Sequence, residues 1–365
     1  MKAQSATLTC VQPTQVFGVY VHVPFCARRC DYCAFATWTD RDHLQVAYMD
    51  ALARDIDRAV AAGMPPASSV FVGGGTPSMV AADALVDVLA RVPLQDGAEV
   101  TVECNPDDVT TELLATYHDG PVNRLSFGVQ SMVPHVLASL GRTHDPDNVR
   151  RSVDLARDAG FESFNLDVIY GAAGESLSDW ETTVRAIAEL EPPHVSAYGL
   201  TVEAGTPLWE DASRHPDDDD QADKYEMADD VLTLGGLDNY EISNWARPGH
   251  ECRHNQLYWE QGDYLGFGCA AHSHASGRRW WNLRTPERYI AAVIDGEATE
   301  AAGETLEPEV RRIEGLQLAL RTKHGVPADS LDADELPGLV EAAGDRLILT
   351  RTGRLLANEV SLRLK

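Results

Sequence analysis

The sequence predicts an α/β protein in which six short strands alternate with helices over the first 205 residues. Runs rich in Val, Ile and Phe recur between amphipathic stretches, which is the pattern of parallel β/α units whose strands are buried on both faces. A doubly wound sheet would satisfy the same alternation. A barrel is favoured because a polar or ligand-type residue follows every predicted strand, as expected where a barrel gathers its site at the carboxyl ends of its strands.

The predicted strands differ in sequence but share this chemistry at their exits. β-Branched and aromatic residues mark the strands, and glycine, proline or polar residues end them. They cover residues 16–23, 69–72, 100–103, 124–129, 163–169 and 195–200. The residues at their exits are, in order, Cys26, Gly74, Glu103 with Asn105, Gln130, Asp167 and Thr201.

Helices are predicted between the strands. An apolar residue at every fourth position from Leu44 to Val60 predicts the first helix, with Asp40 or Asp42 as its N-cap and Gly63 at its end. Further helical segments cover residues 81–92, 147–159 and 177–189.

Beyond residue 205 the alternation stops. The acidic run at residues 215–220 predicts the cap of a helix at 221–234, with a solvated loop as the alternative. A metal site built from adjacent aspartates is not expected, because their side chains diverge. Residues 240–289 are dense in aromatic residues, His and Gly.

The tail of the chain predicts a small α+β module. Its pattern favours a helix, a strand and a final helix at residues 309–320, 346–350 and 353–364. Together with the break in the alternation, this divides the chain into residues 1–205, 206–300 and 301–365.

Composition restricts the classes of function. The 30 Lys and Arg against 57 Asp and Glu argue against a nucleic-acid partner, because such binding depends on cations that neutralise phosphates. No apolar run approaches the roughly 18 residues of a membrane span, and the first fifteen residues lack a signal-peptide pattern, so we expect a cytoplasmic protein. The seven cysteines do not suggest a disulfide framework. The expected free, mostly buried thiols are Cys10, Cys104, Cys252 and Cys269.

Three further thiols lie close together directly after the first strand. Cys26, Cys30 and Cys33 have the spacing C-x3-C-x2-C, and so short a loop keeps them near one another. An iron–sulfur cube has four corners, so three thiolates leave one iron open. A structural zinc ion normally takes four ligands and would need His22 or a distant residue as well. A redox-active cysteine loop is the third possibility.

The spacing and its flanking residues resemble the radical S-adenosylmethionine superfamily. Y-x-H-x-P-F-C and C-x-Y-C are similar to its branch of coproporphyrinogen oxidases and heme chaperones. The resemblance implies a partial (β/α)6 TIM-like barrel and a winged-helix-like C-terminal module. It also implies that the three cysteines hold a 4Fe–4S cluster whose open iron chelates S-adenosylmethionine, and that the reduced cluster cleaves this cofactor to a 5′-deoxyadenosyl radical.

Matching segments imply further cofactor residues. The run of three glycines and Thr76 lacks the lysine of a phosphate loop and alone suits an ordinary turn, but beside the cysteine loop it resembles the superfamily's methionine-binding glycines. A carboxylate can bind ribose hydroxyls or an ammonium group, and arginine can pair with a carboxylate, although any one such residue can also be a satisfied polar group at a strand end. The S-adenosylmethionine residues implied are Tyr20, Tyr32, Gly74, Gly75, Thr76, Glu103, Gln130, Arg142, Asp167 and Thr201.

A second constellation, residues 252–259, suggests a heme site. A neutral imidazole is a good axial ligand for heme iron, and Tyr and Trp offer flat apolar faces, although a His beside aromatics is more often part of a core. The string resembles the H-N-x-x-Y-W element of the heme chaperones, as do residues 240–249 and 271–273. The resemblance implies heme binding through His254, Tyr258 and Trp259.

One position separates the two kinds of protein in this branch. The decarboxylating oxidases carry a further cysteine two residues after the last cluster thiol, where this chain has Phe35. Phe can neither ligate iron nor transfer hydrogen. Two other departures from the family pattern are Ala172-Ala173 in place of Leu-Pro and Cys269-Ala270-Ala271 in place of Pro-Gly-Ala.

The sequence therefore predicts a heme chaperone on a radical S-adenosylmethionine fold, which hands heme to acceptor hemoproteins such as respiratory enzymes and takes electrons from a donor for its cluster. Catalytic turnover is not implied. The alternative is an oxygen-independent coproporphyrinogen III oxidase, an oxidoreductase of porphyrin biosynthesis that decarboxylates propionate side chains. A radical methyltransferase or a heme-degrading enzyme on the same scaffold is a third possibility.

Overall fold

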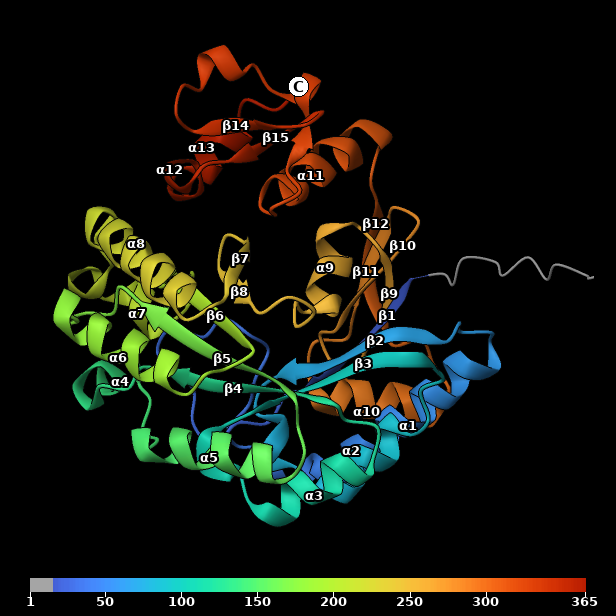
Figure 1. The fold of residues 1–365 in the computed structure, drawn as a ribbon. Coiled ribbons are helices and arrows are strands. Elements are labelled where there is room, and N and C mark those ends of the chain that lie inside the picture. Colours follow the sequence, from blue (N-terminus) through green and yellow to red (C-terminus); the bar gives the residue numbers. More distant parts are fainter. Residues whose placement is uncertain (1–15) are drawn as a thin grey trace, which may run out of the picture.

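The computed structural model describes residues 16–365, and one large sheet runs through most of them (Figure 1). The sheet has 12 strands in the order β12-β11-β10-β9-β1-β2-β3-β4-β5-β6-β8-β7. Cys10 and the segment inspected for a signal peptide lie outside the described residues.

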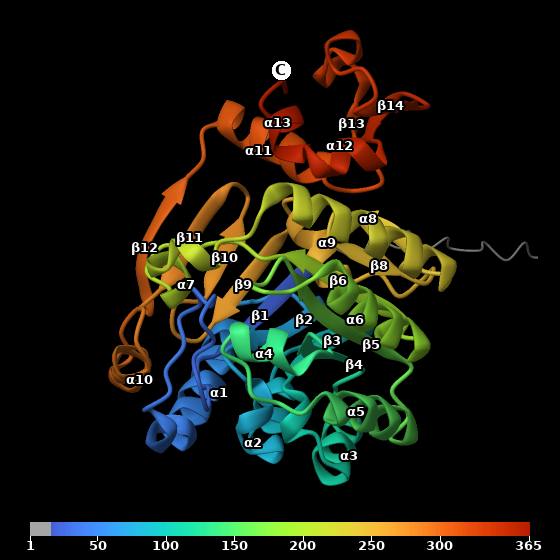
Figure 2. The ribbon, with the colours of Figure 1, turned by 90° about the vertical axis from the view of Figure 1, so that its left-hand side faces the viewer.

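The central strands β1 to β6 form the predicted partial barrel. They pair in parallel and in sequence order, and β1 and β6 bond to other neighbours instead of to each other, so the barrel is open. Figure 2 shows helices α1, α2, α3 and α5 along the outside of these strands. The strands are β1 (Phe17–Val23), β2 (Ala67–Gly74), β3 (Leu94–Cys104), β4 (Arg124–Gln130), β5 (Ser163–Tyr170) and β6 (His194–Gly199). The helices are α1 (Gln45–Ala61), α2 (Ala82–Leu89), α3 (Thr111–Asp119), α4 (Pro134–Ser139), α5 (Pro146–Asp158) and α6 (Leu177–Glu189).

The predicted α/β alternation and partial barrel are confirmed, but two local predictions were wrong. α1 begins at Gln45 after a 3₁₀ turn, and no side chain caps it, so neither Asp40 nor Asp42 is its N-cap. Gly73 and Gly74 continue β2 instead of leaving it, because the parallel pairing with β1 extends through both residues.

Residues 206–300 extend the same sheet at both of its ends. β8 pairs antiparallel with β6 at one end, and β9 pairs parallel with β1 at the other. The expected acidic cap is present, since the Asp217 carboxylate accepts from the N–H of Asp220 in the first turn of α8. The strands are β7 (Asp238–Glu241), β8 (Asn244–Ala246), β9 (Asp263–Phe267), β10 (His272–Ala275), β11 (Arg278–Asn282) and β12 (Glu300–Thr305). The helices are α7 (Pro207–Glu210), α8 (Asp218–Leu234), α9 (Arg253–Trp259) and α10 (Pro286–Asp295).

Residues 308–365 form a small α+β unit, here called the C-terminal module. A three-stranded sheet of order β13-β15-β14 packs with α11 around its own hydrophobic cluster, which includes Leu320, Val326 and Leu347. The final helix is two short helices instead of one. The elements are α11 (Pro308–Leu320), β13 (Val326–Pro327), β14 (Val340–Ala343), β15 (Arg346–Leu349), α12 (Arg351–Leu355) and α13 (Ala357–Ser361). The division of the chain at residues 205 and 300 stays a prediction.

Candidate functional site

The loop after β1 carries the three predicted cluster ligands, and backbone hydrogen bonds hold it in place. The N–H of Cys26 donates to the carbonyl of Trp38 (3.1 Å), and the N–H of Trp38 donates to Pro24 (2.8 Å). Further along the loop, the N–H of Asp31 donates to the carbonyl of Leu140 (3.2 Å). Each of the three thiols is half-buried, so a fixed loop presents them together.

Two of these three sulfurs accept a hydrogen bond from a neighbouring side chain. The Thr76 hydroxyl donates to Sγ of Cys26 (3.6 Å), and a guanidinium nitrogen of Arg142 donates to Sγ of Cys30 (3.8 Å). Burial raises the pKa of Cys26 and of Cys33, and the neighbouring thiols raise both further. Hydrogen bonds to sulfur are among the means by which proteins tune iron–sulfur clusters. The donors and their neighbours therefore fit such a group.

His22, the alternative zinc ligand, already uses both ring nitrogens. Nε2 lies 2.8 Å from the carbonyl of Ala36, and Nδ1 lies 3.1 Å from the Tyr20 hydroxyl. Because a carbonyl only accepts, Nε2 carries the proton and Tyr20 donates to Nδ1. Burial lowers the pKa of His22 to about 4, so the ring is neutral. Within residues 16–365, no three His, Cys, Asp or Glu side chains are already arranged to hold a single metal ion.

The glycines at the end of β2 bring that strand against the cysteine loop. Gly74 has a φ of +110°, and a Cβ there would lie 2.4 Å from the His22 ring. A Cβ on Gly75 would lie 2.6 Å from the carbonyl oxygen of Phe25. The N–H of Thr76 donates to the same carbonyl (2.7 Å). Side chains at these positions would therefore push the two loops apart.

A cavity of about 220 Å³ lies on the inner side of the open barrel. Phe35 of the cysteine loop borders it at the carboxyl ends of the strands, and Asn255 of α9 borders it from the opposite direction. The cavity brings together four predicted S-adenosylmethionine residues and one predicted heme residue. These five are Tyr20, Gly74, Glu103, Asp167 and Tyr258.

Two half-buried carboxylates, Glu103 and Asp167, line this cavity, which we call the barrel cavity. Burial, and after it the nearby Asp167 carboxylate, raise the pKa of Glu103 to about 8. Asp167 accepts from the Ser126 hydroxyl (2.7 Å) and from the Asn165 amide (2.9 Å), which offset part of its own burial. A cationic or hydroxyl-bearing ligand would satisfy both carboxylates.

The remaining predicted cofactor residues divide into two groups. A Cβ on Gly128 would lie 3.1 Å from the amide nitrogen of Gln130 and 3.5 Å from Arg142, so these two converge next to the cysteine loop. Tyr32 packs in a small hydrophobic cluster near the same loop. Thr201 joins neither group: within the described part of the chain its exposed hydroxyl donates to the carbonyl of Gly199 (3.3 Å) and contacts no other predicted cofactor residue.

Sequence reasoning missed the polar side chains along the inside of the strands. Arg124 is buried, and its Nε and one terminal nitrogen have no hydrogen-bond partner within residues 16–365. Polar residues alternate with Leu and Phe in β4 and β5, and this period of two was the available signal for a polar interior. The missed residues that line the cavity are Arg124, Ser126, Asn165, His194, Ser196 and Tyr198.

The helix of the predicted heme motif, α9, closes the amino end of the barrel. The Glu99 carboxylate of β3 accepts from the N–H groups of Arg253 and His254, both at 3.2 Å. A carboxylate at this position satisfies the free donors of the first turn and complements the helix dipole. At the far side, a Cβ on Gly18 of β1 would lie 3.1 Å from Leu257 and 3.2 Å from His254, so the helix packs closely on the strands.

The three predicted heme residues do not face one space. His254 is 0% exposed, with Nδ1 at 2.9 Å from the Ser69 hydroxyl and Nε2 at 2.8 Å from the Tyr258 hydroxyl. Burial lowers the pKa of His254 to about 3, so the ring is neutral. Tyr258 lines the barrel cavity, whereas Trp259 lies on the other side of α9, in a cleft against the C-terminal module.

A chain of hydrogen bonds links the start of α9 to the cofactor carboxylate Asp167. The N–H of Cys252 donates to the Tyr240 hydroxyl (3.1 Å), which lies 2.7 Å from Nε2 of His194. Nδ1 of His194 lies 2.7 Å from the side-chain oxygen Oδ1 of Asn165, and the side-chain nitrogen Nδ2 of Asn165 donates to Asp167 (2.9 Å). Burial lowers the pKa of His194 well below its usual range, so the neutral ring can donate at one nitrogen and accept at the other.

The departure at residues 269–271 has a local explanation. The hydroxyl of Tyr48 donates to the carbonyl of His22 (2.9 Å), and the Cys269 thiol lies 3.4 Å from the same hydroxyl. Ala270 adopts a φ of +55°, a conformation that glycine accepts more readily. Cys269 thus joins a core contact, while Ala270 retains the backbone of a glycine turn.

The departure at Ala172-Ala173 is compensated by a buried ion pair. The Glu175 carboxylate accepts from the N–H groups of Gly171 (2.7 Å) and Ala172 (3.3 Å), which fixes the loop after β5. The fully buried Lys224 of α8 lies 3.2 Å from the same carboxylate. A proline is therefore not needed to define this turn.

The fold and the cysteine loop together define a protein of the radical S-adenosylmethionine class, and comparisons with known proteins agree. The sequence model of the Radical SAM superfamily matches residues 20–187. Proteins named heme chaperone HemW from Mycobacterium tuberculosis and Escherichia coli are 40% and 35% identical to this chain, over 95% and 94% of it and 94% and 96% of their own lengths. The chain belongs to the HemW family.

A solved structure supports the fold. The coproporphyrinogen III oxidase HemN from Escherichia coli, described as a radical SAM enzyme, superposes with a TM-score of 0.83 over 97% of this chain and 91% of its own, at 23% identity. Identity at this level supports the architecture and does not transfer the activity. In addition, none of the helices between residues 16 and 365 has the length and apolar character needed to cross a membrane.

Proposed function

We propose that this chain binds heme, holds a 4Fe–4S cluster with S-adenosylmethionine, and passes heme to acceptor hemoproteins such as respiratory enzymes. The similarity to proteins named heme chaperone HemW, over nearly the whole of both chains, carries the proposal. A separate electron donor reduces the cluster. The six cysteines among residues 16–365 are all free thiols, which suits a reducing cytoplasm.

The chain's own residues would share the work of binding between the cysteine loop and the barrel cavity. Cys26, Cys30 and Cys33 would hold the cluster, which with its cofactor supplies one-electron chemistry when bound. Thr76 and Arg142 would keep donating to the sulfurs that they already contact. Glu103 and Asp167 would accept hydrogen bonds from ribose hydroxyls or an ammonium group, and a cationic ligand would lower the raised pKa of Glu103. Nucleic acid and a membrane span have no part in the proposal.

Phe35 favours the chaperone over the oxidase. Its side chain is 67% exposed and borders the barrel cavity beside the cysteine loop. The oxidases of the branch place a cysteine at this position. A phenyl ring offers neither a transferable hydrogen nor a ligand there, so the chain lacks one group that the oxidase would use.

An anaerobic reconstitution tests the proposal. The full chain, loaded with iron and sulfide, is given S-adenosylmethionine, a reductant and coproporphyrinogen III, and decarboxylated product and 5′-deoxyadenosine are measured. In parallel, hemin-loaded protein is mixed with an apo-hemoprotein, and transfer is followed by the shift in the Soret band. We expect heme transfer without decarboxylation.

Each contrary outcome identifies a different error. Decarboxylation coupled to 5′-deoxyadenosine would make the chain an oxidase, and Phe35→Cys would then be expected to change its rate. A colourless preparation that contains zinc and no iron would contradict the cluster. Failure to bind hemin would contradict the chaperone function as a whole.

A further inference from the structure

Arg124, the first residue of β4, is 2% exposed and is the only buried arginine within residues 16–365. Its side chain lines the amino end of the barrel cavity. No hydrogen bond or ion pair of the described residues involves its guanidinium, and Nε and Nη2 are also shielded from solvent. Arginine is charged at every accessible pH, and a buried charge without a partner is costly. The roles proposed for the cofactor and heme residues leave this group unused.

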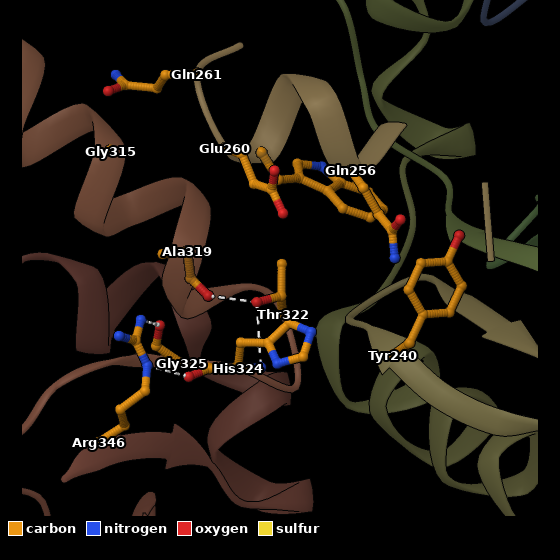
Figure 3. Close-up of a pocket in the computed structure, with 11 residues that line it drawn as sticks. Tyr240, Gln256, Glu260, Gln261, Gly315, Ala319, Thr322, His324, Gly325 and Arg346 are labelled. Carbon is orange, nitrogen blue, oxygen red and sulfur yellow. Dashed lines mark hydrogen bonds between the residues drawn. The ribbon is translucent and has the colours of Figure 1, made fainter. Parts of the chain in front are cut away.

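Other cations of the chain show how such a group is normally satisfied. The fully buried Lys224 ammonium donates to the Asp220 carboxylate at 2.6 Å. In the cleft on the outer side of α9, the Arg346 guanidinium donates to two backbone carbonyls, both at 2.6 Å (Figure 3). Arg124 has no equivalent partner among residues 16–365, so its donors point to an acceptor from outside the chain.

A second polar group without a partner lies beside Arg124 on the neighbouring strand. Thr101 of β3 pairs in register with Arg124, and register partners of parallel strands point their side chains to the same face. It alternates along β3 with the same period as Glu99, which caps α9, and Glu103, which lines the barrel cavity. Thr101 is 0% exposed, and its hydroxyl has no hydrogen-bond partner within the described residues. Because most buried polar side chains are hydrogen-bonded, two adjacent exceptions point to a group that binds between them.

The atoms without partners are donors, which indicates the class of ligand. Nε and Nη2 of Arg124 belong to one planar, charged group, and the hydroxyl of Thr101 can add a third donor. A carboxylate accepts two parallel hydrogen bonds from such a fork. The cavity of about 220 Å³ is smaller than the range of about 300–1,000 Å³ that is typical of complete small-molecule sites. Its amino end therefore suits a small acid or the acidic arm of a larger ligand.

The acidic residues near this end are directed to other partners. Glu99 accepts from the first N–H groups of α9, and Asp167 accepts from side chains of β4 and β5. The pKa of Glu103, which burial and the Asp167 carboxylate raise to about 8, keeps that group protonated at neutral pH, so it does not repel an anion. None of the three takes the place of an acceptor at Arg124.

We propose that the amino end of the barrel cavity is a carboxylate-binding site, in which Arg124 donates to both carboxylate oxygens and the Thr101 hydroxyl donates to one of them. The site lies at the opposite end of the cavity from Phe35 and the cysteine loop. It goes beyond the proposed function, because neither the cluster nor heme is needed for it. A small organic acid or the acidic arm of a larger ligand can supply the carboxylate, which would offset the cost of the buried charge.

The test measures the binding of propionate, a short monocarboxylate, to the full-length protein without added cofactors. Isothermal titration calorimetry and thermal unfolding are carried out with propionate, and with the neutral isostere propionamide and sodium chloride as controls. We expect saturable propionate binding that raises the melting temperature, and no saturable effect of propionamide. Arg124→Lys keeps the charge but loses the planar fork, and should weaken propionate binding at least about tenfold.

A second variant removes the unpaired hydroxyl at nearly constant volume. Thr101→Val should weaken propionate binding about threefold to tenfold, and should leave the melting temperature of the ligand-free protein unchanged because no hydrogen bond is lost. Thr183→Val is the matched control. The Thr183 hydroxyl is equally buried, lies 3.1 Å from Oγ of Ser131 and accepts from the N–H of Met132 (3.1 Å). This control should melt about 2–4 °C lower and bind propionate as the parent does.

Two results would overturn the site. They are equal effects of propionate and propionamide on the parent, and propionate binding that neither Arg124→Lys nor Thr101→Val weakens; either would leave the two groups to a buried water. Heme transfer tests the chaperone proposal separately, so that proposal would stand.

Competition distinguishes the two sources of the carboxylate. Displacement of propionate by hemin, but not by hemin dimethyl ester, would assign the site to the acidic arm of a tetrapyrrole. Displacement by neither would assign it to a free organic acid. Both results support a carboxylate site at Arg124.

Discussion

The two ends of the barrel differ in how they are built. At the carboxyl ends of the strands, the cysteine loop and the glycine loop pack directly on each other, and each predicted group comes from a short continuous motif. At the amino ends, α9 closes the barrel, and its neighbouring residues face different spaces: Tyr258 lines the barrel cavity, and Trp259 lines the outer cleft. A motif in a loop can thus keep its residues together, whereas a motif on a helix distributes them around an axis.

This difference implies that the two ends can be disabled separately. The barrel cavity is the smaller of the two, is lined mainly by polar and aromatic side chains and contains the carboxylates of Glu103 and Asp167. The cleft is larger, bounded by Trp259 and Tyr240, and open to solvent. Five substitutions test this comparison, beginning with the one of largest expected effect.

Cys26→Ala should abolish the iron–sulfur cluster, because a cube cannot be held by two thiolates alone. Iron and sulfide analysis and the charge-transfer absorption of anaerobically reconstituted protein measure the loss. Hemin affinity should stay within about twofold, since α9, which carries the predicted heme residues, lies at the other end of the barrel. Cys104→Ala, which removes a buried thiol next to Glu103, is the control and should retain its iron. Simultaneous loss of cluster and hemin would break the comparison.

Trp259→Leu and Tyr258→Phe compare the two faces of α9. Removal of the indole should weaken hemin binding about tenfold, because a large aromatic contact is lost. Tyr258→Phe removes the hydroxyl bonded to His254 and should lower the free energy of unfolding by about 1 kcal/mol with little change in hemin affinity. Titration and denaturant unfolding of both variants provide the measurements. The reverse order of hemin effects would show that heme contacts the Tyr258 hydroxyl and not the Trp259 indole.

Glu103→Gln should change how stability depends on pH. Burial raises the pKa of Glu103 to about 8 in the folded state, above its unfolded value of 4.5. The folded state therefore holds a proton that the unfolded state releases, and this contribution to stability is complete below pH 4.5 and is lost as pH rises through about 8.

The amide of the Gln variant does not titrate, so its melting temperature should exceed that of the parent by about 2–4 °C at pH 8 and match it more closely at pH 5. Thermal unfolding of cofactor-free protein gives the values. The exposed Glu162→Gln serves as the control and should show no such pH-dependent gain. Equal melting curves for parent and Glu103→Gln at both pH values would show that the folded structure does not raise the pKa of this carboxyl group.

Ala270→Gly should have the smallest effect and should stabilise the turn beside Tyr48. A non-glycine residue with a φ of +55° pays about 1 kcal/mol, part of which glycine loses again through its larger unfolded-state entropy, so we expect a gain of about 0.5 kcal/mol. Denaturant unfolding measures this gain. The adjacent Ala271→Gly should instead destabilise, because that residue is buried and absent from the positive-φ positions.

Much of the barrel could be predicted because local pattern and topology agree there. Strands rich in Val and Phe, each followed by a helix, have few alternative arrangements, and the exits of parallel strands necessarily share one edge. The convergence of Cys26, Gly74 and Glu103 therefore followed from sequence. The sequence did not predict that β2 continues through Gly73 and Gly74. Their pairing with β1 depends on strand register, whereas the prediction used glycine's local preference for turns.

The amino end was harder to predict for a physical reason. His254, Tyr258 and Trp259 are close in sequence, but whether a helical residue faces a cavity depends on what packs on each side of the helix. The cleft is completed by Tyr240 and by His324, which are separated by more than eighty residues in the chain. Sequence spacing alone does not predict that these two residues line the same cleft. The polar interior, in contrast, was encoded in the alternation of β4 and β5.

The placement of β8 and β9 at opposite flanks of the barrel has a consequence for dissecting the chain. A fragment limited to residues 20–187 would lack β6 and expose rows of unpaired peptide groups along β1 and β5. Such bare flanks invite intermolecular strand pairing and precipitation. We therefore expect residues 20–187, the part that the family model matches, to fold only together with the strands that follow them in the chain.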